Sequence, residues 1–102
     1  MLLEGYLAKK HIYPKDEVHV VVTRTAKSVL APSWDLLNNY KDGKITWSEY
    51  IKRYVKEMDN VDAIAEMLRI KKLAETRDVR LICYEKTYPC HRYILMVLIY
   101  AI

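Results

Sequence analysis

The segment VHVVVT, residues 18–23, decides the fold class of this chain. It is β-branched and almost entirely apolar, which is typical of a strand covered on both faces, as in a parallel sheet. The segment VRLICY, residues 79–84, has the same character. Parallel strands need a long crossover connection, and the chain between these segments carries helical signals. The pattern therefore predicts an α/β fold built on a parallel sheet.

Three helices are predicted between the two strands. Ser33 is a suitable N-cap for a short helix that ends at Asp42-Gly43, and the sequence TWSE, residues 46–49, is a capping box for a second helix. A third helix follows Asn60. The residues expected to face inward are Trp34, Leu36, Leu37 and Tyr40 in the first helix, Trp47, Tyr50, Ile51, Tyr54, Val55 and Met58 in the second, and Val61, Ile64, Ala65, Leu68 and Leu73 in the third.

Both ends of the chain add further elements. Cys90-His91-Arg92 opens a last helix that runs from Tyr93 to about Tyr100, and residues 2–13 form either a third strand or an edge hairpin. We therefore expect one domain, residues 1–102, with a small parallel sheet of two or three strands and helices packed on it in a Rossmann-like three-layer arrangement. The apolar last helix favours a homodimer.

Composition limits the classes of function. Hydrophobic residues make up 52% of the chain and charged residues 29%, which indicates a folded protein. The longest apolar run, residues 93–102, is about half the length that spans a membrane, and no signal-peptide pattern precedes the first strand, so a cytoplasmic location is expected. The few amide side chains and many Ile, Lys and Glu favour a heat-adapted source. The net charge of +4 permits an anionic partner, whereas neither glycine lies in a phosphate-loop motif.

A candidate site follows from the order of the elements, because ligands of open α/β sheets bind at the carboxyl ends of the strands. Cys90 lies at a helix start, where the dipole and the unpaired N–H groups stabilise a thiolate. Cys83 is its candidate resolving or disulfide partner. Glu85 could orient His91 or act as a general base, and His91 could carry a positive charge. These four are the candidate catalytic residues.

Arg24 and Arg92 are the candidate anion-binding residues, because a guanidinium grips phosphate or carboxylate as a fork. Arg24 ends the first strand, so we expect it to meet the stretch from Cys83 to Arg92 in one pocket. A structural alternative stands beside each role. Arg24 could pair with Glu85 or Asp35, and Glu85 with Arg92.

The cysteines and the histidine also have structural alternatives. Cys83 could be an inert core thiol, Cys90 a small residue that fits a helix start, and His91 a helix-surface residue with one hydrogen bond. The spacing C-x6-C-H matches no common zinc motif, so neither a metal nor another cofactor is expected.

The stretches LICYEK, residues 81–86, and CHR, residues 90–92, resemble the signature of the family called domain of unknown function 488. In that family an apolar strand ends in C-x-E and is followed by C-H-R. The strand ending in Arg24, the LAPS segment of residues 30–33, and WSEY of residues 47–50 followed by Tyr54 are also similar to the family pattern. The resemblance covers residues 18–98. It implies a compact α/β fold with one site.

The site that the resemblance implies is made by Arg24, Cys83, Glu85, Cys90, His91 and Arg92, and the family supplies no agreed reaction. Two features depart from its pattern. Many members carry an acidic residue at the position of Val22, and we expect no counterpart here of a strand that longer members place after the last helix.

Three functions remain open. One is a cysteine-dependent enzyme or redox protein that acts on an anionic small molecule. The second is a phosphate, nucleotide or nucleic-acid binding module without catalysis, where nucleic acid rests on the charge alone because no helix has a basic base-reading face. The third is a structural or assembly protein in which the cysteine pair staples a loop. The sequence does not decide whether the protein is an enzyme.

Overall fold

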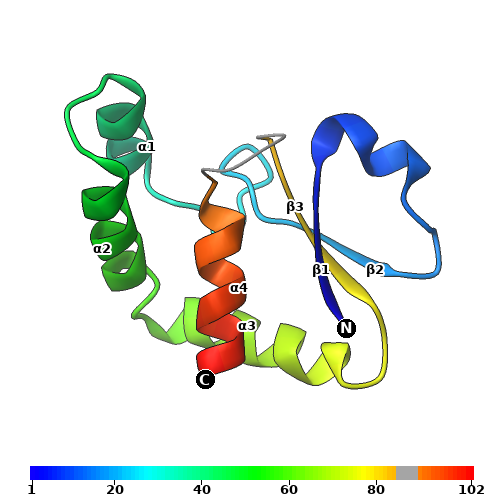
Figure 1. The fold of residues 1–102 in the computed structure, drawn as a ribbon. Helices are drawn as coiled ribbons and strands as arrows, with labels where there is room; N and C mark the ends of the chain where they lie inside the picture. Colours follow the sequence, from blue (N-terminus) through cyan, green and yellow to red (C-terminus); the bar gives the residue numbers. More distant parts are fainter. Residues whose placement is uncertain (85–89) are drawn as a thin grey trace.

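The fold of this chain, in a computed structural model, is described for residues 1–84 and 90–102. Its sheet has three parallel strands in the order β1-β3-β2, with helices packed around it (Figure 1). Along the chain the elements are β1 Leu2–Tyr6, a 3-10 helix Leu7–Ile12, β2 Val18–Val21, α1 Trp34–Lys41, α2 Trp47–Glu57, α3 Val61–Ala74, β3 Val79–Cys83 and α4 His91–Ala101. The predicted α/β class and parallel sheet are confirmed.

The amino-terminal stretch forms a third strand and not a hairpin. β1 and β2 both run parallel to β3 and lie on opposite sides of it, so they do not pair with each other. Leu2 is paired with Val79 at one end of the register and Tyr6 with Cys83 at the other. The connection between β1 and β2 is the 3-10 helix, which was not predicted from the sequence.

The predicted helix starts are confirmed by side-chain caps. The Ser33 hydroxyl accepts a hydrogen bond from the Leu36 N–H, and the Thr46 hydroxyl accepts one from the Glu49 N–H. These bonds satisfy backbone donors that the first helical turn leaves without partners. The turn between α1 and α2 contains Gly43 at φ 73°, a conformation that favours glycine.

Two of the helices differ in part from the inward faces predicted for them. Trp34 of α1 is 53% exposed, and in α3 Val61 and Leu68 are exposed while Met67 and Ile70 are buried. Ile64 and Leu73 pack against the core as predicted, whereas the prediction was wrong for Val61, Ala65 and Leu68 because several apolar stripes are possible on this helix. The large Met67 and Ile70, with Ala63, lie on the stripe that packs against the rest of the core. The α2 stripe is largely confirmed: Tyr50, Tyr54 and Met58 are buried, but Val55 is exposed.

The two faces of the sheet have different coverings. Val79, Leu81 and Cys83 alternate along β3 and belong to the same hydrophobic core as the buried residues of the α-helices. On the opposite face the Arg80 guanidinium stacks 4.3 Å from the ring of Tyr13, which follows the 3-10 helix. The sheet is therefore covered by α-helices on one face and by this short segment on the other.

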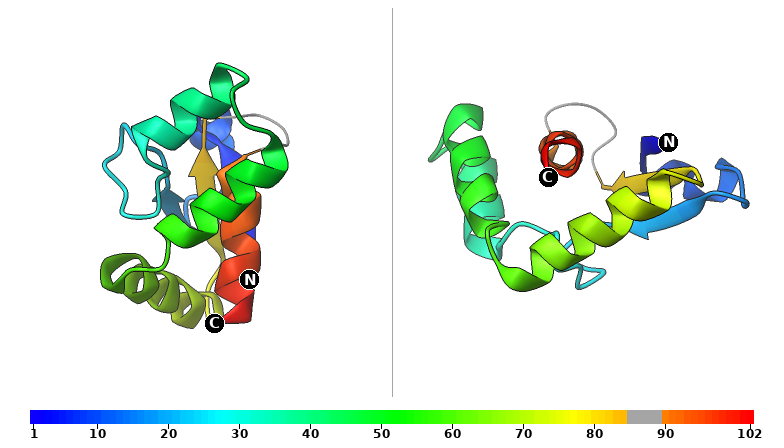
Figure 2. Two further views of the ribbon diagram at one scale, coloured as in Figure 1. Left: turned by 90° about the vertical axis from the view of Figure 1, so that its left-hand side faces the viewer. Right: turned by 90° about the horizontal axis from the view of Figure 1, so that it is seen from below.

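The last helix turns back beside the sheet. α4 contacts β1, β3, α2 and α3, and its first turn lies at the carboxyl end of β3 (Figures 1 and 2). The candidate site residues at the end of β3 and at the start of α4 are therefore brought together. Among the described residues, no helix combines the length and the apolar character needed to span a membrane.

Candidate functional site

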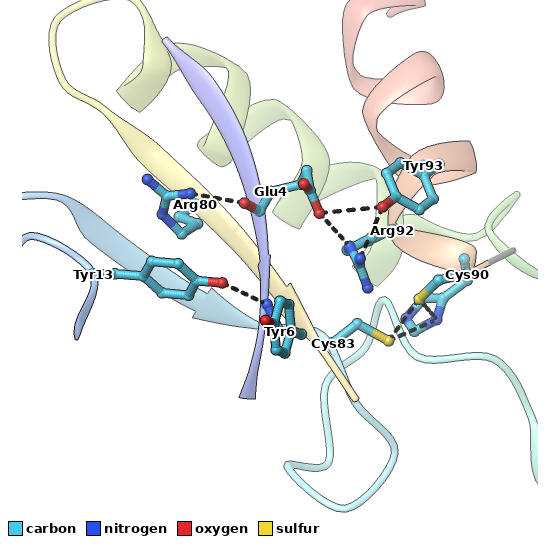
Figure 3. Close-up of polar contacts among 9 residues, drawn as sticks. Glu4, Tyr6, Tyr13, Arg80, Cys83, Cys90, Arg92 and Tyr93 are labelled. Carbon is cyan, nitrogen blue, oxygen red and sulfur yellow. Dashed lines mark hydrogen bonds and ion pairs between the residues drawn. The ribbon is translucent and has the colours of Figure 1, made fainter. Parts of the chain in front are cut away.

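The two cysteines meet at the carboxyl end of the sheet. Cys83 is the last residue of β3, and Cys90 is the N-cap of α4. Their Sγ atoms lie 2.8 Å apart, with Cys90 as donor, and both residues are thiols that are almost completely buried (Figure 3). The fold thus places two thiols in direct contact, in a position where the start of a helix favours negative charge on Cys90.

His91 directs one ring nitrogen toward both thiols. Its Nδ1 lies 3.5 Å from the Cys83 Sγ and 3.7 Å from the Cys90 Sγ. Its Nε2 lies 2.7 Å from the backbone carbonyl oxygen of Val22. A carbonyl oxygen only accepts, so Nε2 carries the proton and donates it to this bond. In the neutral ring, Nδ1 therefore presents a lone pair toward the two sulfur atoms.

The environment makes the two thiols unequal. The hydrogen bond from Cys90 and burial in the core together raise the pKa of the Cys83 thiol far above its ordinary range, and the nearby His91 lowers it only in part. Cys83 therefore stays protonated over the physiological pH range. Cys90 is the better candidate for a thiolate, because it faces the amino end of α4.

A cavity of about 230 Å³ opens beside Cys83 and His91, and Arg24 lies on its wall. The expected meeting of Arg24 with the stretch that begins at Cys83 is therefore what the fold produces, although Arg24 itself is exposed. The described residues that line this cavity are Thr23, Arg24, Thr25, Pro32, Trp34, Leu37, Lys41, Cys83, Tyr84 and His91.

A second cavity of about 390 Å³ also borders His91 and is lined by Cys90. Leu37, Lys41 and His91 line both cavities, so the two spaces adjoin. Each thiol thus borders one of two neighbouring cavities, and the Lys41 side chain belongs to both. We call them the Arg24 cavity and the Cys90 cavity.

Arg92 occupies a different place from the other candidate residues. Its side chain is completely buried, and its Nε donates to the Glu4 carboxylate of β1 over 2.7 Å (Figure 3). It also donates to the Tyr93 hydroxyl at 2.9 Å, and its guanidinium stacks on the Tyr93 ring. Arg92 is not among the described residues that line the Arg24 cavity. Its observed contacts are those of a structural ion pair that joins α4 to β1.

The sequence of this chain matches the family DUF488-N3a, described as the active DUF488-N3 subclade, over residues 12–101. The chain belongs to the DUF488-N3a family. A search of curated proteins and a search of solved structures each gave no significant match. The matched range contains Arg24, both cysteines, His91 and Arg92, whereas β1 with Glu4 lies before it.

Two positions of this DUF488-N3a protein connect the structure with the resemblance. Val22 stands where the resemblance leads one to expect an acidic residue, and here its side chain is in the core while its backbone carbonyl accepts a hydrogen bond from His91. The orientation of the imidazole therefore needs no carboxylate at this position. Glu85, the predicted base or orienting residue, lies outside the described residues.

The donor atoms of Cys83, Cys90 and His91 all lie within 4.8 Å of one another, so this set could hold a metal ion. Two cysteines and a histidine are a donor set that zinc accepts. However, two sulfurs on one tetrahedral zinc ion lie roughly 3.8 Å apart, given a Zn–S distance of about 2.3 Å. The Sγ atoms here are 2.8 Å apart and would have to separate. The observed spacing favours contact between thiols over metal coordination.

Several residues of the site were not predicted from the sequence. Lys41 and Trp34 line the Arg24 cavity from opposite ends of α1, and Tyr84 contributes from the end of β3. The Tyr84 hydroxyl accepts a hydrogen bond from the Thr25 hydroxyl at 3.1 Å. Lys41 could have been suggested by its place seven positions after Trp34 on one helix, since both then lie on one face.

Proposed function

We propose that this protein is a cysteine-dependent enzyme that acts on an anionic small molecule, whose anionic group is held between Arg24 and Lys41 and whose reacting end extends past Lys41 into the adjoining Cys90 cavity. The observation that carries the proposal is the imidazole of His91, whose Nδ1 faces two buried thiols beside a cavity with cationic walls. A nucleophile, a base and a group that orients the base form the usual arrangement for thiol catalysis. The description of its family as an active subclade agrees with an enzyme.

Each residue has a definite part in the proposed reaction. The thiol proton of Cys90 moves to Nδ1 of His91, and the sulfur forms a bond to the electrophilic atom of the substrate. The leaving group departs with the electron pair of the broken bond and takes the proton back from His91. Arg24 and Lys41 hold the anionic group, and Cys83 keeps its proton and donates to the Cys90 thiolate.

Two alkylating agents of nearly equal size test this assignment. Iodoacetate is an anion and iodoacetamide is neutral, so their relative rates report the charge of the cavity as well as the reactivity of the thiol. We expect Cys90 to be the first residue alkylated, as located by peptide mass spectrometry. We expect iodoacetate to react faster, relative to iodoacetamide, than it does with a small free thiol.

Matched variants separate the contributions. Arg24→Ala and Lys41→Ala should each reduce the preference for iodoacetate while leaving the iodoacetamide rate near the wild-type value, because only the anion interacts with their charges. His91→Gln should slow both reagents. Lys52→Ala on the exposed side of α2 is the control for net charge. Alkylation of Cys90 no faster than that of a small free thiol, with no preference for iodoacetate, would remove the proposal.

The contact between the two sulfurs favours a redox role as the second candidate. In that reaction a small disulfide would accept two electrons from the dithiol. Cys90 would displace one thiol from the disulfide, and Cys83 would then displace the second thiol and close a Cys83–Cys90 disulfide. A thiol reductant would restore the pair. Incubation with oxidised glutathione distinguishes this role: an intramolecular disulfide and two equivalents of released glutathione support it, whereas a stable mixed disulfide at Cys90 contradicts it.

Two partner predictions are tested separately. The exposed Val97 and Tyr100 on α4 support the predicted homodimer, and sedimentation of the wild type as a monomer at micromolar concentration would exclude it. A binding role for nucleic acid is supported only by the net charge of +4. It requires affinity for duplex or single strands that falls steeply with salt, and the absence of such binding at low ionic strength would exclude it.

A further inference from the structure

Two large aromatic side chains line the Arg24 cavity without being buried. Trp34 is 53% exposed and Tyr84 is 59% exposed, although the sequence pattern places Trp34 in the core. Trp34 begins α1, whose buried residue is Leu36, so its indole is turned from the core toward this cavity. An exposed tryptophan in a cavity wall is a stacking surface for a flat ring, because ring stacking adds to the gain from removing apolar area from water.

The charged side chains that line the same cavity, among the residues that the structure describes, are both positive. Arg24 and Lys41 contribute two cations, and among the described residues that line the cavity there is no carboxylate. The hydroxyl of Thr23 accepts a hydrogen bond from the Ala26 N–H, and the hydroxyl of Thr25 donates to Tyr84. A guanidinium and an ammonium that line one cavity suit phosphate better than a neutral or cationic group.

The size of the cavity limits the ligand further. Its volume of about 230 Å³ is at or below the lower end of the roughly 300–1,000 Å³ that is usual for ligand pockets. This space suits a compact molecule with part of its surface left in solvent, and it is too small for a dinucleotide. The ligand must therefore combine a ring and an anion within the size of a mononucleotide.

From these features we propose that the Arg24 cavity binds a nucleoside monophosphate, with its base stacked on Trp34 and its phosphate held by Arg24 and Lys41. The proposal rests on the proposed function only in taking this cavity as the substrate site. It adds a class of molecule to that function. A free phosphate would leave Trp34 without a role, and a neutral aromatic ligand would leave the two cations without one.

Isothermal titration calorimetry with three probes tests the two halves of the ligand. The probes are 5′-AMP, ribose 5-phosphate, which lacks the base, and adenosine, which lacks the phosphate. We expect 5′-AMP to bind at least about tenfold more tightly than either fragment, since stacking of one base on an aromatic side chain typically changes affinity by that order. Equal affinity for 5′-AMP and ribose 5-phosphate would overturn the stacking, and equal affinity for 5′-AMP and adenosine would overturn the phosphate site.

Variants assign each half to its residues. Trp34→Ala should weaken 5′-AMP by about tenfold and leave ribose 5-phosphate unchanged, and Trp34→Phe should restore most of the affinity because it restores a ring. Arg24→Ala and Lys41→Ala should weaken 5′-AMP and ribose 5-phosphate but not adenosine. Arg53→Ala, an exposed arginine on α2 paired with Glu49, is the control for charge. Circular dichroism establishes that each variant is folded.

The same titration separates this proposal from the proposed function. Cys90→Ser abolishes the thiol but leaves Trp34, Arg24 and Lys41 in place, so it should bind 5′-AMP with wild-type affinity. If the wild type binds 5′-AMP while Cys90 is unreactive, the ligand class stands and the enzyme proposal fails. If Cys90 is reactive and no binding of 5′-AMP is detected at millimolar concentration, the ligand class fails and the enzyme proposal stands.

Discussion

Val22 and Tyr54 hold the imidazole of His91 in place, Val22 through its backbone carbonyl oxygen and Tyr54 through its ring. The carbonyl oxygen of Val22 fixes the proton on His91, and the ring of Tyr54 meets the imidazole edge to face with centroids 5.5 Å apart. Cys83, Cys90 and His91 could be predicted from the sequence because their side chains have a recognisable chemistry. A backbone carbonyl has none.

Tyr54 provides the first prediction about stability. It is completely buried, and its hydroxyl donates to the Leu30 carbonyl oxygen at 2.6 Å. Tyr54→Phe leaves this carbonyl oxygen without that donor inside the core, which should lower the free energy of unfolding by about 1–3 kcal/mol. Urea denaturation followed by circular dichroism measures the change. Tyr100→Phe, at an exposed position, should have no measurable effect, and a similarly small effect of Tyr54→Phe would contradict the assigned role.

The contact between α4 and β1 joins the start of the last helix to the edge of the sheet. The Arg92–Glu4 ion pair and the Tyr93 ring join the first turn of α4 to the edge strand β1 (Figure 3). His91 belongs to the same turn. The sequence identified Arg92 as chemically important but not its partner. Glu4 lies 88 residues away, in a stretch for which the sequence predicts either a strand or a hairpin.

Removing Glu4 tests this connection between elements. Glu4→Ala leaves the buried Arg92 guanidinium without its carboxylate, and a lost hydrogen bond to a charged group should lower the free energy of unfolding by roughly 1.5–3 kcal/mol. The lower part of this range is expected because 40% of the Glu4 side chain is exposed to solvent. Glu66→Ala removes a comparable but exposed pair with Arg69 and is the matched control. Equal losses from the two variants would show that burial of Arg92 adds nothing.

The fold of the whole chain was easier to predict than its site. The apolar strands at residues 18–23 and 79–84 and the capped helices between them determine a parallel α/β arrangement, which is confirmed. The packing faces of α1 and α3 were less certain, because a helix with apolar residues on several sides is oriented by its neighbours. This is also why Trp34 was expected in the core and not in the cavity wall, since its place depends on how α1 rotates against the sheet, and Lys41 lies on the same helix face.

Acid stability depends on an ion pair that holds β3 to the chain before β2. Two hydrogen bonds from the Arg80 guanidinium lower the pKa of Glu17 from its ordinary value of 4.5, with a smaller contribution from His19 and against the effect of burial. A carboxyl with a depressed pKa in the folded state stabilises the fold above its unfolded pKa and loses this contribution as the pH falls through its folded pKa.

A pH series tests this link. We expect Glu17→Gln to be less stable than the wild type near pH 7, and the difference between the two proteins to shrink as the pH falls below about 4. Urea denaturation of both proteins, from about pH 7 to about pH 3, measures it. Glu49→Gln, an exposed partner of Arg53, is the control and should follow the wild type. A difference between Glu17→Gln and wild type that stays constant with pH would contradict the assignment.

The position of β3 in the middle of the sheet also affects how the protein folds during its synthesis on the ribosome. β1 and β2 are synthesised early, yet each takes its hydrogen-bonded neighbour from residues 79–83. Until that segment leaves the exit tunnel, both early strands expose unpaired edges to other nascent chains and to chaperones. The sheet therefore assembles in a single late event, followed directly by the helix that carries His91, so the thiol pair and its imidazole come together only when nearly the whole described chain has emerged.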